Sequence, residues 1–175
     1  MNRLLSRAFV AAVTLSALAV PAFAHSTLEV KEAKVGASYK AVLKVPHGCE
    51  GQPTHTVKVQ IPEGYFAVKP MPKAGWNLEV KTGKYAKAYM NHGTEVTEGV
   101  VEIVWSGGNL PDAFYDEFVF TGTFAPDLPT EQKFYFPAIQ VCDTGENAWI
   151  DTSGDPAAAK PAPSLTLKPA DAAAH

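Results

Sequence analysis

A histidine follows directly after a stretch of sequence that is typical of a protease cleavage site. Residues 19–30 are AVPAFAHSTLEV, in which Ala22 and Ala24 form the A-x-A pattern that precedes cleavage of a signal peptide. A chain that begins with histidine offers its α-amine and its ring Nδ1, which can chelate one ion together. Nitrogen donors of this kind suit Cu(II). His25 is therefore a candidate copper ligand, and the alternative is that it follows the cleavage site by chance.

The sequence contains two cysteines, Cys49 and Cys142. In an exported chain an even pair of cysteines usually forms a disulfide, because the compartment is oxidising. The alternative is a thiol metal site or a nucleophile, but the two cysteines lack the C-x-x-C spacing of zinc and redox sites. We predict a disulfide that closes a loop of more than 90 residues and stabilises the fold by about 4–5 kcal/mol.

That disulfide would bring two polar segments together. VPHGCEGQPTHT at residues 45–56 contains Glu50, and CDTGENAW at residues 142–149 ends on Trp149. Bonded cysteines have Cα atoms about 5.5–6 Å apart, so a carboxylate and an indole can face a common point. The alternatives are that Glu50 is a solvated loop acid and that Trp149 is a core aromatic.

The other histidines and the methionines are weaker candidates. His47 lies in the same loop and is either an additional ligand or a side chain that caps a turn. His55 begins a predicted strand and is assigned a structural role, and His92 lies in a predicted exposed turn. Met71 and Met90 offer soft sulfur to Cu(I), but two isolated methionines are better explained by packing. The sequence has no G-x-S-x-G, P-loop or H-E-x-x-H motif, so we expect no enzyme activity.

The N-terminal segment indicates export. Two arginines and no acid precede the apolar run AFVAAVTLSALAV at residues 8–20, which predicts a signal peptide over residues 1–24. The run is short for a membrane span, which needs about 20 apolar residues, although an anchor is the alternative. Cleavage after Ala24 would release a periplasmic or secreted chain without a membrane span.

The mature chain is expected to be a single acidic domain. Removing 24 of the 175 residues leaves 151, and the loss of two arginines and no acid changes the net charge from −3 to −5. A chain of this length suits one domain with a full core. Its negative charge argues against nucleic-acid binding, which needs a basic surface.

Short segments of alternating polarity predict an all-β fold. An alternation of period two indicates a half-buried antiparallel strand, and turn residues separate the segments. We predict strands at residues 26–32, 38–45, 55–61, 77–81, 100–105, 117–124, 133–141 and 148–152. About eight strands at this spacing favour a two-sheet sandwich over a barrel.

The C-terminal segment is rich in alanine and proline and cannot form a core of its own. PSLTLK at residues 163–168 is predicted to add one edge strand, which places the end of the domain at residue 168. Residues 169–175 are predicted to be a disordered tail.

The same segments resemble the YcnI-like family, also known as DUF1775. The stretches that match are AHSTLEV, VPHGCEGQPTHTVKVQIPEG, VKPMPKAGW, IVWSGGNLPDAFYDEFVF and FYFPAIQVCDTGENAWID, in the expected order over residues 24–152. The resemblance implies an immunoglobulin-like β-sandwich that is exported across the inner membrane. It also implies Cu(II) bound by a single-histidine brace, in which the N-terminal histidine falls on His25, the carboxylate on Glu50 and a nearby tryptophan on Trp149.

The role implied by the resemblance is copper trafficking or buffering beside other periplasmic copper-handling proteins. This chain differs from simpler members in its HGC insert and in the partner cysteine Cys142, which place His47 close to the proposed ion. It also lacks the C-terminal membrane helix of some members. We therefore expect a copper chaperone or buffer. The alternatives are a mono-copper redox enzyme resembling polysaccharide oxygenases, in which His47 would be a ligand, and a secreted immunoglobulin-like interaction module without metal.

Overall fold

The computed structural model describes residues 25–171. The predicted signal peptide at residues 1–24 and the last four residues of the predicted tail lie outside this range. Between residues 25 and 171 the chain forms twelve strands and no helix, which confirms the all-β prediction. It therefore contains no helix in that range that is long and apolar enough to cross a membrane.

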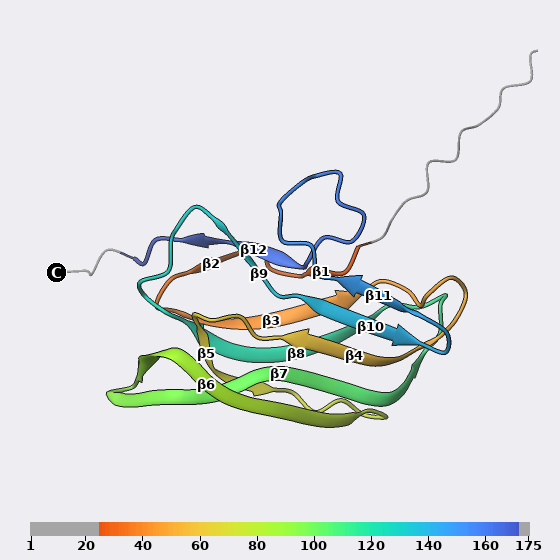
Figure 1. Cartoon of the computed structure of the whole chain (residues 1–175), viewed down its shortest axis with the longest axis horizontal. Coiled ribbons are helices and arrows are strands. Elements are labelled where there is room, and N and C mark those ends of the chain that lie inside the picture. Colours follow the sequence, from red (N-terminus) through yellow and green to blue (C-terminus); the bar gives the residue numbers. More distant parts are fainter. Residues whose placement is uncertain (1–24, 172–175) are drawn as a thin grey trace, which may run out of the picture.

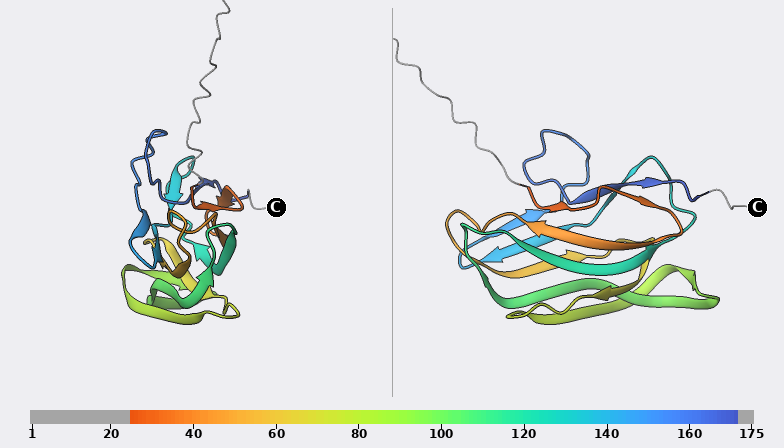
Figure 2. Two further views of the ribbon diagram at one scale, coloured as in Figure 1. Left: turned by 90° about the vertical axis from the view of Figure 1, so that its right-hand side faces the viewer. Right: turned by 180° about the vertical axis from the view of Figure 1, so that it is seen from behind.

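The strands form three sheets (Figure 1). A four-stranded sheet has the order β1-β3-β8-β5, and a five-stranded sheet has the order β11-β10-β4-β7-β6. A three-stranded sheet, β2-β12-β9, lies along one edge of these two (Figure 2). The strand bounds are β1 Thr27–Leu28, β2 Glu32–Lys34, β3 Ser38–Val45, β4 Thr54–Gln60, β5 Tyr65–Pro70, β6 Asn77–Asn91, β7 Thr94–Leu110, β8 Asp116–Phe124, β9 Lys133–Tyr135, β10 Ala138–Cys142, β11 Glu146–Trp149 and β12 Ser164–Lys168.

The core lies between the four-stranded and the five-stranded sheets, as expected for a sandwich. On β4, Val57 and Val59 are buried while Lys58 and Gln60 point outward, so the period-two pattern decides which side chains enter the core. Burial of apolar side chains from both sheets supplies the main driving force for this packing. The largest fully buried apolar side chains are Trp105, Tyr65, Phe118, Phe120, Phe124 and Phe136.

The hairpin of β6 and β7 is much longer than the predicted strands at residues 77–81 and 100–105. Its outer half extends beyond the sandwich (Figure 1) and contains many exposed charged side chains, which hide the alternation in the sequence. A small apolar cluster of Phe66, Tyr89 and Ala125 anchors this half. The long-range packing of Tyr89 thus extends a strand that local polarity does not predict.

The prediction that PSLTLK forms an edge strand is wrong. β12 is the middle strand of its sheet, parallel to β2 on one side and antiparallel to β9 on the other. Leu165 and Leu167 are each 2% exposed and belong to the main core. Their burial explains the central position of β12. A strand whose side chains enter the core buries more surface and pairs more backbone groups with a neighbour on each side than with one neighbour.

Candidate metal centre

His25 lies at one end of the sandwich, immediately before β1. The next residue, Ser26, is buried, and its hydroxyl donates a hydrogen bond of 2.9 Å to the carbonyl oxygen of Lys44 on β3. Thr27 pairs with Lys44 in the ladder of the four-stranded sheet. These bonds fix the backbone that leads to His25, while the imidazole itself is only half-buried.

Trp149, in the five-stranded sheet, contacts His25. It is the last residue of β11, it pairs with Ala138 of β10, and it is 4% exposed. The ring centroids of His25 and Trp149 are 5.9 Å apart, and the two planes stand at 82°, which is an edge-to-face contact. The structure therefore brings together two of the three residues that the resemblance assigns to the site.

A buried amide that was not predicted from the sequence holds the indole. Gln140 on β10 accepts a hydrogen bond of 3.2 Å from Trp149 Nε1. Its Nε2 donates to the carbonyl oxygen of His47 at 2.5 Å and to Thr54 Oγ1 at 2.7 Å. Its signal in the sequence is a polar residue at an inward position of an alternating strand, which is costly to bury unless it is bonded.

The predicted disulfide is present. Cys49 and Cys142 are bonded with their Cα atoms 6.1 Å apart, and the described chain has no free cysteine, so the thiol alternative is not supported. The bond joins the loop after β3 to the end of β10. Cys142 Sγ lies 3.6 Å from Thr54 Oγ1, and Asn147 Nδ2 donates to Cys49 Sγ at 3.5 Å.

Glu50 lies at the tip of a tight turn. The backbones of Cys49 and Gln52 exchange two hydrogen bonds of 2.9 Å, and both central residues, Glu50 and Gly51, have positive φ of 50° and 87°. This is the φ pattern of a type I′ hairpin turn. The exposed Glu50 borders a hollow of about 170 Å³ together with Lys160, which His25 does not line.

Asp151 shares a hollow with His25 and was not predicted as a site residue. This hollow has a volume of about 200 Å³, and Tyr135 of β9 also lines it. Asp151 follows Trp149 by two residues, so an extended chain points both side chains to the same side, whereas Ile150 between them is exposed. The backbone N–H of Ser153 donates to Asp151 Oδ1 at 2.8 Å.

His47 faces its own loop. Its Nδ1–H donates to the carbonyl oxygen of Gly48 at 2.6 Å, and the same nitrogen lies 3.9 Å from Asp112 Oδ1. The bond occupies Nδ1, because a carbonyl oxygen can only accept. His47 thus contacts the Trp149 network through its backbone carbonyl oxygen.

Over residues 25–171, no three side chains of His, Cys, Asp or Glu gather to form a metal site. A brace at His25 does not need three such side chains, because one residue supplies both nitrogens. In the translated chain the nitrogen of His25 is a peptide nitrogen bonded to Ala24, and only cleavage makes it an amine. The imidazole of His25 is half-exposed beside the indole, and Asp151 and Asp155 are the carboxylates that line its hollow.

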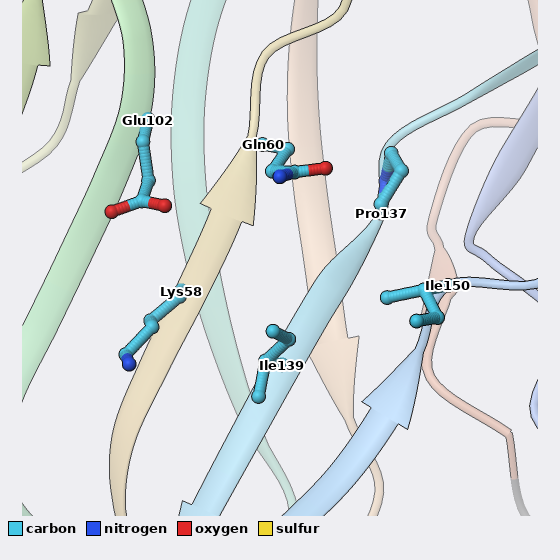
Figure 3. A pocket seen from close by; sticks show the side chains of 6 residues that line it. All are labelled: Lys58, Gln60, Glu102, Pro137, Ile139 and Ile150. Atoms are coloured by element: carbon cyan, nitrogen blue, oxygen red, sulfur yellow. The ribbon is translucent and has the colours of Figure 1, made fainter.

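A different hollow, of about 310 Å³, lies on the outer face of the five-stranded sheet. Figure 3 shows that its side chains come from β4, β7 and β10, from the residue before β10 and from the residue after β11: Lys58, Gln60, Glu102, Pro137, Ile139 and Ile150. It offers one amine, one amide and one carboxylate but no imidazole, and Lys81 pairs with Glu102 at 2.5 Å. We therefore place the candidate metal centre at His25.

Comparison with solved structures found one that supports an immunoglobulin-like fold. The most informative solved structure is an uncharacterized protein from Nocardia farcinica with an immunoglobulin-like fold, which is 24% identical with a TM-score of 0.61 over 82% of this chain and 98% of that one. A cohesin module of a family 33 glycoside hydrolase from Clostridium perfringens is 15% identical with a TM-score of 0.45, over 83% of this chain and 97% of that one. No curated protein matches the sequence.

The family assignment rests on the length of the match. The pattern of the family described as "Domain of unknown function (DUF1775)" matches residues 25–167, from the candidate metal centre to the end of β12. The described fold is all-β and immunoglobulin-like, as in the solved relative. The chain therefore belongs to the DUF1775 family.

Proposed function

We propose that the mature protein is an exported Cu(II)-binding protein, a chaperone or buffer that holds the ion at an N-terminal His25. The observation that supports this most directly is the contact between the rings of His25 and Trp149, directly after the predicted cleavage site. The contact places a buried indole beside the ring of the first mature residue, where it can shield a bound ion from solvent. Export is part of the proposal, and the Cys49–Cys142 disulfide supports it because such bonds persist in oxidising compartments.

The proposed ligand set contains two nitrogens and one carboxylate. His25 supplies its amine and Nδ1, and both must be free of protons when the ion binds. A tetragonal set of nitrogen and oxygen donors suits Cu(II). The resemblance assigns the carboxylate to Glu50, whereas the shared hollow favours Asp151.

Trp149 is proposed to cover one side of the ion. Its indole offers no lone pair to a metal, because the Nε1–H is a donor and is bonded to Gln140. A covered ion has fewer open positions for oxygen, which favours transport of copper over turnover. We therefore propose that the protein is not an enzyme, and sustained oxidase or peroxide turnover by the copper-loaded protein would contradict this.

A Cu(II) titration followed by electron paramagnetic resonance tests the proposal. Two proteins are compared, the mature chain that begins at His25 and the same chain with the α-amine of His25 acetylated. We expect a one-to-one site with nitrogen coupling in the first and binding at least about tenfold weaker in the second, because the amide nitrogen replaces the amine. A tenfold change corresponds to about 1.4 kcal/mol of binding free energy.

His92→Ala is the matched control. This histidine lies in the exposed turn between β6 and β7, so its removal should leave the titration unchanged. Equal binding by the two N-terminal forms, or no binding by either, would overturn the copper proposal and favour an immunoglobulin-like interaction module. A signal that needs His47 as a second imidazole would instead favour the oxygenase-like arrangement.

A further inference from the structure

Gln140 is not part of the proposed ligand set, yet its amide accepts a hydrogen bond from the indole that contacts His25. It is 1% exposed, and both atoms of its amide are bonded. The orientation of the amide follows from its partners. The carbonyl oxygen of His47 can only accept and the indole N–H of Trp149 can only donate, so Nε2 must face His47 and Oε1 must face Trp149.

The bond to Gln140 selects one orientation of the indole. A tryptophan ring can turn over about its Cβ–Cγ bond within a similar volume, and a polar partner at Nε1 favours one of the two positions. In the observed position the ring meets the imidazole of His25 at 82° with centroids 5.9 Å apart. The hydrogen-bond partner of Nε1 therefore determines which edge of the indole ring faces the imidazole of His25.

The same amide reaches the loop that contains the disulfide. Its two N–H bonds end on His47 and Thr54, which flank Cys49 and Glu50 in the sequence, and Thr54 contacts Cys142 Sγ. Gln140, on β10, therefore links Trp149 at the end of β11 to the loop of residues 47–54. This link adds to the disulfide, to the pairing of β10 with β11 and to the bond between Asn147 and Cys49.

We propose that Gln140 is a positioning residue that holds the Trp149 indole against His25 and ties its position to the loop of residues 47–54. Its consequence for copper rests on the proposed function: the ion keeps its indole cover only while Gln140 bonds Trp149. Loss of Gln140 leaves the donors of His25 intact but opens the ion to water.

Nuclear magnetic resonance of the metal-free mature protein tests the positioning role without copper. In Gln140→Met, which keeps the length of the side chain but not its hydrogen bonds, we expect Trp149 Nε1–H to exchange with solvent at least about tenfold faster. We also expect the nuclear Overhauser contacts between the rings of Trp149 and His25 to be lost. Trp105 Nε1–H, which donates to the carbonyl oxygen of Met71 at 3.1 Å, is the internal reference.

Two further variants separate positioning from general destabilisation. Gln140→Glu retains an acceptor for the indole, so it should restore the slow exchange at Trp149 while disturbing the bonds to His47 and Thr54. Gln60→Met changes an exposed glutamine on β4 and should change neither signal. Unchanged Trp149 exchange and ring contacts in Gln140→Met would overturn the proposal. If Gln140→Met does not fold, the exchange of Trp149 Nε1–H is measured in the unaltered protein and in Gln140→Glu. Rapid exchange in the unaltered protein would overturn the proposal. Slow exchange in both proteins would support it.

The copper-loaded proteins test the consequence for the ion. Electron spin echo modulation from exchangeable deuterons measures water at Cu(II), and it should increase in Gln140→Met while the one-to-one stoichiometry is kept. Equal water signals in the two proteins would overturn the role toward the ion. If the unaltered mature protein binds no Cu(II), the proposed function fails, whereas the exchange of Trp149 Nε1–H still decides the positioning role.

Discussion

Glu50 and Asp151 both offer carboxylate oxygens to copper, but they lie in different parts of the structure. Glu50 is at the tip of a turn beside Lys160, whereas Asp151 lines the hollow of His25. We therefore expect Asp151→Asn to weaken Cu(II) binding by at least about tenfold, or ~1.4 kcal/mol, and Glu50→Gln to weaken it by less. Competition titration with a chelator of known affinity measures both. Glu95→Gln, which changes an exposed carboxylate on β7 outside that hollow, is the control.

The opposite ranking would assign the carboxylate to Glu50, as the resemblance implies. It would also mean that the turn at Cys49–Gln52 moves toward His25 when the amine is freed. Equal, small effects of both variants would instead show that water completes the coordination.

The long β6–β7 hairpin is an element that extends away from the metal centre. Its outer half is held by Tyr89, which is 4% exposed and stacks on Phe66 with centroids 4.7 Å apart and planes at 4°. Tyr89→Ala removes this contact and should lower the free energy of unfolding by about 3 kcal/mol, the usual cost of deleting a buried aromatic ring. Because the hairpin tip lies far from β1, which follows His25 in the chain (Figure 1), we expect unchanged Cu(II) binding.

Chemical denaturation gives the stability, and amide exchange shows where it is lost. Faster exchange should be confined to residues 84–98. Tyr115→Ala is the matched control, since Tyr115 is 60% exposed and should change stability little. Weaker copper binding by Tyr89→Ala would contradict the separation of the hairpin from the site.

At the scale of the whole molecule, the disulfide constrains both the unfolded chain and the loop of the site. Cys49 and Cys142 are 93 residues apart, so the chain-entropy model assigns the bond about 4–5 kcal/mol. Cys49→Ser with Cys142→Ser should lower the melting temperature by about 10 °C, at ~2–4 °C per kcal/mol for a domain of this size. Calorimetry with and without a reductant measures it. The reductant should shift the melting of the original protein alone, and an unchanged melting temperature in the double variant would contradict the expected stabilisation.

The sequence by itself determined the disulfide and most of the strands, but not β5 or the outer half of the β6–β7 hairpin. Alternation of period two is local, so it shows which side chains of β3 or β4 face the core before any strand has a neighbour. Two cysteines allow only one intramolecular pair. These features need no knowledge of how distant segments pack.

Only the tertiary structure decided which residues surround His25 and which strand is central. The sequence marks Gln140 only as a polar residue at an inward strand position, and it does not mark Asp151 at all. Their surroundings follow from the pairing of β10 with β11 and from the hollow beside β9. β12 appears in the sequence as an isolated edge segment, yet β2 and β9 enclose it. Neighbour relations between strands depend on the free energy of the whole packed core, which a short stretch of sequence does not encode.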